Sequence, residues 1–181
     1  RSIMKKIILL HSFLLFSGFL FGLAAYFCLP EEQILALQQY LTVQMQDLSA
    51  TATLAETAGR VFRSNAMDFV RVYLAGICLL GVPLILLFLF LKGFTFGFVA
   101  CFLLAHSPLL LLSRLLYFPS LIAVAVLGCR FSLMLVQNRA SSPLRQLLQY
   151  TVGFAFLLVL VLLLSCIDGF SSYHYLHGLL G

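Results

Sequence analysis

His106 and Ser107 are adjacent residues whose types could support chemistry. A serine nucleophile beside a histidine base would suit an intramembrane hydrolase. Adjacent residues on a helix, however, point in different directions, and no Gly-x-Ser-x-Gly turn surrounds the serine. The sequence therefore favours interhelical hydrogen bonding for this pair, and we predict no catalytic residue.

His174 and His177, with Asp168 nearby, come closest to a metal-ligand pattern. A catalytic zinc ion needs three protein ligands in a fixed arrangement, which this terminal segment does not offer. The cysteines have no metal-ligand spacing and lie in or beside apolar runs, where Cys packs as a small side chain. They are Cys28, Cys78, Cys101, Cys129 and Cys166. We expect no metal and no cofactor, while a disulfide between Cys28 and Cys166 stays open.

Ionisable residues inside apolar segments are a third possible source of function. A charge in the bilayer is energetically costly, so such residues are usually kept only where they serve a function. The candidates are His11, His106, Arg114 and Arg130. A channel or a transporter (permease) subunit could place such groups along a pathway. We expect all six carboxylates to lie outside the membrane, which argues against proton-coupled transport.

The composition defines the class of protein to which these residues belong. Of 181 residues, 62% are hydrophobic and only 9% are charged, whereas soluble domains have about 25% charged residues. The net charge is +5, but the basic residues stand at the ends of apolar runs rather than in one patch. The sequence predicts an integral membrane protein that binds no nucleic acid.

Apolar runs of sufficient length predict an all-α, polytopic transmembrane bundle that forms a single domain over residues 1–181. The first run is longer than the apolar core of a signal peptide, so we interpret it as an uncleaved helix. Whether residues 105–120 form a crossing hairpin or a re-entrant segment stays open. The five expected spans are 7–29, 70–91, 94–112, 115–135 and 150–167.

Residues 30–68 should form an amphipathic helical segment outside the cytoplasm, beginning at Pro30 with two glutamates in its first turn. It either caps the bundle or docks a partner outside the membrane. The side chains that we predict for docking share an apolar or amide character. They are Leu37, Leu41, Met45, Leu48, Phe62 and Asn65.

The distribution of Lys and Arg predicts the orientation in the membrane. Five crossings with a cytoplasmic N-terminus place seven of these residues inside and four outside. This agrees with the positive-inside rule and leaves the C-terminus extracytoplasmic. In this interpretation Lys92 marks the cytoplasmic end of the second span.

Glycines predict where helices pack closely. Gly18-x-x-x-Gly22 lies in the first span and Gly93-x-x-x-Gly97 begins the third. Small residues at this spacing let helix backbones approach within one chain or between two copies, so a homo-oligomer stays open. Gly81 and Pro83 are expected to bend the second span.

The same central residues resemble a known family. Leu80-Gly81-Val82-Pro83-Leu84, the run to Phe90-Leu91-Lys92-Gly93, and Gly97-Phe98 are similar to the central motif of the stage II sporulation protein M family. The motif positions are Gly81, Pro83, Lys92, Gly93 and Gly97. The segment from Ala105 to Phe118 departs from the pattern, because it is shorter and lacks the Pro-Gln-Asn element of that family.

The resemblance implies a non-enzymatic scaffold in the cell membrane of an endospore-forming bacterium. Such a platform localises two peptidoglycan hydrolases, a lytic transglycosylase and an amidase, for septal wall thinning and engulfment of the forespore. The family contributes no catalytic residue.

Overall fold

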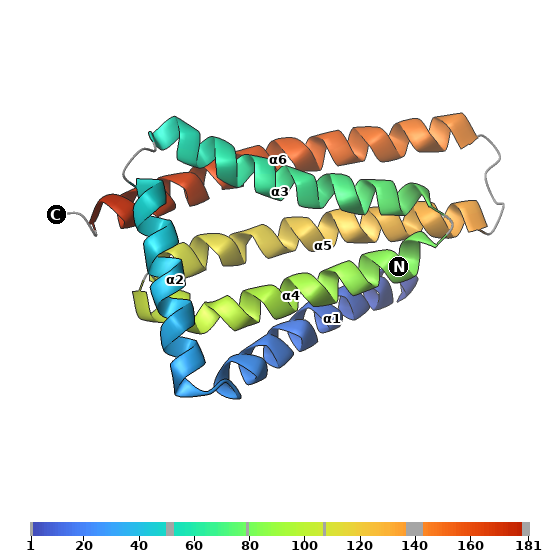
Figure 1. The fold of residues 1–181 in the computed structure, drawn as a ribbon. Coiled ribbons are helices and arrows are strands. Elements are labelled where there is room, and N and C mark those ends of the chain that lie inside the picture. The colour runs from blue at the N-terminus through green and yellow to red at the C-terminus, as the bar shows by residue number, and fades with distance from the viewer. Residues whose placement is uncertain (1, 50–52, 79, 107, 137–142, 179–181) are drawn as a thin grey trace.

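The chain forms a bundle of long α-helices, shown in Figure 1 from a computed structural model. The structure describes residues 2–49, 53–78, 80–106, 108–136 and 143–178, and no strand occurs among them. Its helices are α1 (Ser2–Phe27), α2 (Glu31–Ser49), α3 (Leu54–Ile77), α4 (Gly81–His106), α5 (Pro108–Val136) and α6 (Pro143–Gly178). The all-α prediction is confirmed.

Five helices run between the two ends of the bundle, with α1 inclined to the others, and α2 crosses one end (Figure 1). Among the described residues, α1, α4, α5 and α6 each contain a segment long and apolar enough to cross a membrane. The more polar α3 lies beside them. The architecture is that of a multi-pass membrane protein, in which the N- and C-termini lie at opposite ends (Figure 1).

Local sequence signals account for the start of α2 and of α3. Glu31 and Glu32 occupy the first turn of α2, where carboxylates complement the helix dipole. Thr53 caps α3: its side chain accepts from Glu56 N at 3.3 Å, and Glu56 Oε2 accepts from Thr53 N at 3.1 Å. This capping box fixes the point at which the chain turns from α2 into the bundle.

The predicted span 70–91 is wrong, because the chain reverses within it. Residues 70–77 complete α3, and residues 81–91 begin α4. Cys78 N donates to Ala75 O at 3.0 Å, and Gly81 N donates to Cys78 O at 3.0 Å. Pro83 lies in the first turn of α4, where backbone N–H groups have no acceptor within the helix. The N–H that proline lacks is therefore not missed, and Pro83 belongs to the start of a helix instead of bending one.

This reversal also moves Lys92. It was expected at the cytoplasmic end of a helix, but it lies near the middle of α4, which continues to His106. The predicted span 94–112 is therefore divided between α4 and α5. Residues 105–120 contain the connection between these two helices. Both helices run the length of the bundle, so the segment belongs to a helical hairpin and not to a re-entrant loop (Figure 1).

The predicted outer segment 30–68 is likewise divided. Its first part forms α2, as expected, but the part from Leu54 belongs to α3 and lies within the bundle. The buried residues of α3 recur at helical spacing and include Val61, Phe69 and Val72. Phe69 and Val72 join a core with Leu89 of α4 and other buried side chains.

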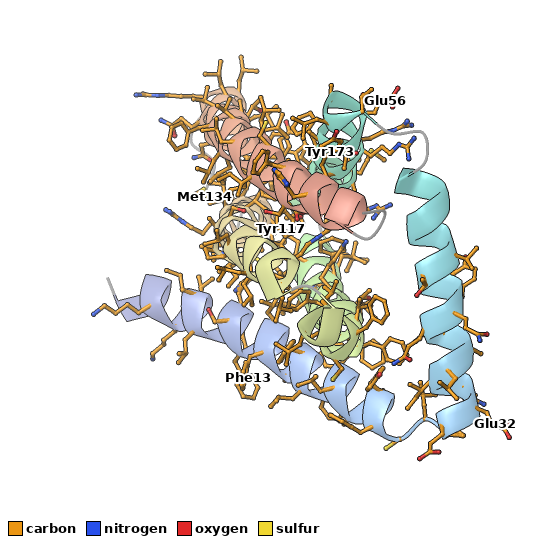
Figure 2. All side chains as sticks on the ribbon, turned by 90° about the vertical axis from the view of Figure 1, so that its left-hand side faces the viewer. Phe13, Glu32, Glu56, Tyr117, Met134 and Tyr173 are labelled. Carbon is orange, nitrogen blue, oxygen red and sulfur yellow. The ribbon has the colours of Figure 1, made fainter. Side chains whose placement is uncertain are left out.

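Large apolar side chains cover the outside of the bundle. Phe13 is 67% exposed and points away from the other helices (Figure 2). Leu9 and Phe156 are also exposed. In water such a surface would be unfavourable, whereas hydrocarbon chains solvate it.

The two glycine motifs pack against each other within one chain. A Cβ atom at Gly18 would clash with the carbonyl oxygen of Phe90, and one at Gly93 would clash with that of Leu15. Gly22 and Gly97 make equally close approaches, to Phe94 O and Phe19 O. The backbones of α1 and α4 are therefore in direct contact, an arrangement that small residues permit in lipid.

Candidate functional site

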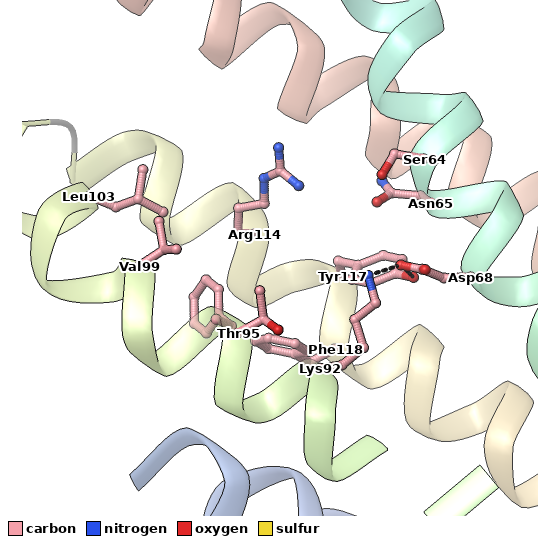
Figure 3. Close-up of a pocket in the computed structure, with 11 residues that line it drawn as sticks. Ser64, Asn65, Asp68, Lys92, Thr95, Val99, Leu103, Arg114, Tyr117 and Phe118 are labelled. Atoms are coloured by element: carbon pink, nitrogen blue, oxygen red, sulfur yellow. Dashed lines mark hydrogen bonds and ion pairs between the residues drawn. The ribbon is translucent and has the colours of Figure 1, made fainter. Parts of the chain in front are cut away.

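Asp68 is the centre of a charged site inside the bundle. Its side chain, on α3, is only 4% exposed. Lys92 Nζ of α4 lies 2.5 Å from its Oδ2, and Arg71 Nη1 lies 3.2 Å from its Oδ1. The Tyr117 hydroxyl of α5 donates to Oδ2 at 3.3 Å. Figure 3 shows the Lys92 and Tyr117 side chains converging on the carboxylate.

These contacts connect three helices through one carboxylate. A buried charge is tolerated when its partners satisfy it, and removing one partner of such a pair typically costs about 3–5 kcal/mol. Asp68 also shows that the predicted absence of carboxylates inside the membrane is wrong. The carboxylate lies on the buried stripe of α3, between Asn65 and Phe69.

A second ion pair connects α5 with α6. Arg114 Nε lies 3.1 Å from Asp168 Oδ2, and the Asp168 side chain is 5% exposed. Asn65 Nδ2 of α3 donates to Ser165 Oγ of α6 at 3.0 Å. Together these contacts extend the polar interior from α3 across to α6.

A cavity of about 300 Å³ lies beside Asp68. Its polar lining includes Ser64, Thr95 and Arg114, and its apolar lining includes Val99 and Leu103. Figure 3 shows that these side chains come from α3, α4 and α5. The site is thus a cavity with a charged wall and an apolar wall, and its volume is at the lower end of the range for small-molecule pockets.

A second hollow, of about 350 Å³, adjoins the first and shares Ser64, Asp68 and Lys92 with it. The two hollows are lined by five cationic side chains, whereas Asp68 is the one carboxylate among the described residues that lines them. The cations are Arg60, Arg63, Arg71, Lys92 and Arg114. With Asp168 counted as the partner of Arg114, the region has three more positive than negative charges.

Comparison with known proteins identifies the family. A family model described as Stage II sporulation protein M matches residues 11–172. The chain belongs to the stage II sporulation protein M family. Neither the curated proteins nor the solved structures gave a match.

Residues of the central family motif have distinct physical roles here. Gly93 and Gly97 contact α1, and Gly81 lies against the carbonyl oxygen of Ala75 at the reversal. Lys92 pairs with Asp68. In this sporulation-family protein the motif therefore contributes close packing on one side of α4 and an ion pair on another.

The pathway residues proposed for a channel do not come together. Arg130 is exposed and lies near the C-terminal end of α5. His106 is the last residue of α4 and therefore lies close to the N-terminal end of α5. At 1.5 Å per residue, the stretch of α5 from Pro108 to Arg130 is about 33 Å long. The side chain of His106 and all of Ser107 lie outside the described residues.

His11 has a structural place between α1 and α5. Its Nδ1 lies 2.6 Å from Ile7 O, and its Nε2 lies 3.1 Å from Cys129 Sγ. His174 is exposed and packs edge-to-face on the Phe170 ring. The described residues contain no group of three metal ligands, and their five cysteines, including Cys28 and Cys166, are free thiols.

The predicted docking residues are only partly accessible. Leu37 and Phe62 are half-buried, and Asn65 is buried in its bond to Ser165, which removes it from a docking surface. The side chains of Leu41, Met45 and Leu48 lie outside the description. Sequence reasoning missed Asp68, although an acid within the stripe Val61, Asn65, Phe69 and Val72 was a visible signal.

Proposed function

We propose that this member of the sporulation family is a non-enzymatic platform that localises peptidoglycan hydrolases, a lytic transglycosylase and an amidase, for septal thinning and forespore engulfment. The observation that best supports it is the placement of α2. This helix crosses one end of the bundle instead of joining it (Figure 1). Its closest packing in the bundle is with α6.

The outer surface of α2 has the composition of a docking site. Leu35, Tyr40 and Val43 are more than half exposed. They lie on the helix that crosses the end of the bundle, so the bundle does not bury them. Leu35 and Val43 also line a shallow hollow with Gln38, Gln39 and Thr42. Apolar anchors surrounded by amide and hydroxyl groups are typical of protein interfaces.

The orientation that this function requires agrees with the placement of charge. Lys5 and Lys6 begin α1, Arg145 lies in the first turn of α6, and Arg130 lies near the end of α5. All four are at the end of the bundle opposite α2 (Figure 1). The positive-inside rule makes that end cytoplasmic, so α2 and the C-terminus face the cell-wall side.

The test removes the apolar anchors of α2. A variant with Leu35→Ser, Tyr40→Ser and Val43→Ser should reach the membrane but recruit the two hydrolases at least about tenfold less, because a combined loss of about 1.4 kcal/mol in binding free energy over the three side chains already lowers the affinity tenfold. Co-precipitation from membranes of sporulating cells measures this loss. Engulfment should stop at the same stage as in cells lacking the protein.

The matched control removes three exposed leucines at the opposite end: Leu80→Ser, Leu144→Ser and Leu148→Ser. Recruitment should be unchanged in this variant. Normal recruitment by the α2 variant, with both proteins present in the membrane in equal amounts, would reject the platform.

One observation favours a second candidate, a transport or channel component. Asp68 and Lys92 form an ion pair near the middle of α4, beside a cavity. Transport predicts flux of an ion or small solute in proteoliposomes that Asp68→Asn abolishes. The platform predicts that neither the wild type nor this variant produces flux.

A further inference from the structure

We propose that a cationic groove between α3 and α4 binds the phosphate headgroup of an anionic membrane lipid. The groove is defined by Arg60, Arg63, Arg71 and Lys92 and corresponds to the second hollow described above. Its occupant would be a lipid whose acyl chains remain in the surrounding bilayer. This binding site is separate from the docking surface on α2.

The charges of the groove call for an anion. Asp68 brings one negative charge against both Lys92 and Arg71. Arg60 and Arg63 form no ion pair within the part of the chain that the structure describes. Uncompensated positive charge beside a low-dielectric interior is unfavourable, so binding of a phosphate would be stabilised here.

The position of the groove along the bundle indicates a lipid. Lys92 lies at the level of Gly18, about midway along the apolar span of α1, because Phe90 and Phe94 of α4 pack against that glycine. From Arg60 to Arg71 the groove follows α3 over about 16 Å, at 1.5 Å per residue. These cations therefore extend from the α2 end of the bundle into the depth of the membrane.

The groove is open on its outer side. Every residue that lines it belongs to α3 or α4, and Arg71 is 61% exposed. Figure 2 shows α2 standing beside α3 and α4, along the flank of the bundle that these two helices form. A lipid of the leaflet at the α2 end could thus enter laterally. Its phosphate would meet Arg60 and Arg63, which lie at the end of the groove nearest the headgroup region.

The side chains also match the chemistry of the headgroup. Guanidinium groups bind phosphate oxygens through paired N–H donors, and the exposed Ser64 hydroxyl can add a further hydrogen bond. A headgroup such as phosphatidylglycerol has a net negative charge. Phosphatidylcholine would bring a cation toward four cationic side chains, so it should bind more weakly.

The experiment measures lipid binding by the full chain, purified in a neutral detergent. Native mass spectrometry during titration with phosphatidylglycerol or phosphatidylcholine gives the affinity of the first bound lipid. Arg60→Gln with Arg63→Gln should weaken phosphatidylglycerol binding roughly 25-fold, at about fivefold per cation near a membrane surface. Both side chains are exposed, so the variant should fold.

Two further variants define the cause. Lys5→Gln with Lys6→Gln removes the same charge at the other end of the bundle and should leave the first affinity within about twofold. Arg60→Lys with Arg63→Lys keeps the charge and should retain most of the binding. Helical circular dichroism and a monodisperse elution profile verify folding, and the single Arg63→Gln variant gives the same comparison if the double variant aggregates.

Three results would overturn the proposal. One is equal loss of binding in the Arg60/Arg63 and Lys5/Lys6 variants, which would indicate general attraction by net charge. Another is equal affinity for phosphatidylcholine. The third is displacement of phosphatidylglycerol by an equal concentration of glycerol 3-phosphate, which would indicate a site for a water-soluble phosphate.

Discussion

Two faces of α4 hold neighbouring helices in opposite ways. On one face, Gly93 and Gly97 bring the backbone of α4 against α1 without any charged group. On the other, Lys92 reaches Asp68 of α3 and forms an ion pair. Lys92 and Gly93 are adjacent in the sequence, yet the rotation of about 100° per residue in a helix directs them to different partners.

The difference shows what each contact requires in a lipid environment. Glycine contacts depend on shape: dispersion attraction is gained when backbones approach, and no polar group loses solvation. The ion pair gains electrostatic attraction but must offset the desolvation of both charges. The glycine face should therefore tolerate no added volume, while the charged face should tolerate a change of volume but no unpaired charge.

Gly93→Leu should produce the largest effect. The side chain would enter the space of Leu15 O on α1, and two helix backbones cannot move aside without separating. We expect a loss of roughly 3 kcal/mol or more in the free energy of unfolding, which is large for a single substitution. Unfolding in mixed detergent micelles, followed by circular dichroism, measures it.

Gly59 of α3 provides the matched control, since a Cβ added there would have no atom within 4 Å apart from the neighbouring backbone of its own helix. Gly59→Leu should be neutral or stabilising by up to about 1 kcal/mol, because leucine has the higher helix propensity. Equal stability of the two variants would contradict direct backbone contact between α1 and α4.

The same contrast explains which parts of the structure could be predicted from the sequence. Gly18, Gly22, Gly93 and Gly97 follow a local spacing whose meaning in lipid is general, so their involvement in packing was recognisable. Which helices they join was not, because pairing depends on the path of the whole chain. The amphipathic α2 was also recognisable, from its proline and two glutamates.

The charged face could not be predicted from hydropathy alone. The run over residues 70–91 is apolar throughout apart from Arg71, so the reversal between α3 and α4 leaves little trace in it. Without that reversal, the sequence predicts that Lys92 lies at the end of a helix and that Asp68 lies outside the membrane. Their pairing across α3 and α4 depends on a tertiary contact that periodicity does not encode.

Lys92→Met tests the charged face and should have the second-largest effect. It leaves the buried Asp68 with Arg71 and Tyr117 as its remaining partners. We expect a loss of about 2–3 kcal/mol, somewhat below the usual range for a broken buried pair because the Lys92 side chain is 32% exposed. The same unfolding measurement applies.

Adding Asp68→Leu to Lys92→Met should restore most of the lost stability, because replacing both charges by apolar groups of similar size is often neutral. Arg71 is exposed and can turn outward, so the hydroxyl of Tyr117 is the one group expected to lose its partner in the interior. If the double variant is less stable than Lys92→Met, then the carboxylate of Asp68 stabilises the bundle independently of Lys92.

The hydrogen bond between Asn65 and Ser165 lies between the two extremes, since it is polar but uncharged. Ser165→Ala should cost about 1 kcal/mol, and Asn65→Ala with Ser165→Ala should cost less than the sum of the single changes. Thr42→Ala, at an exposed hydroxyl that bonds within its own helix, is the control and should fall within about 0.5 kcal/mol of the wild type. Additive single changes would mean that this bond contributes nothing of its own. The association of α3 with α6 would then depend on packing, as that of α1 with α4 does.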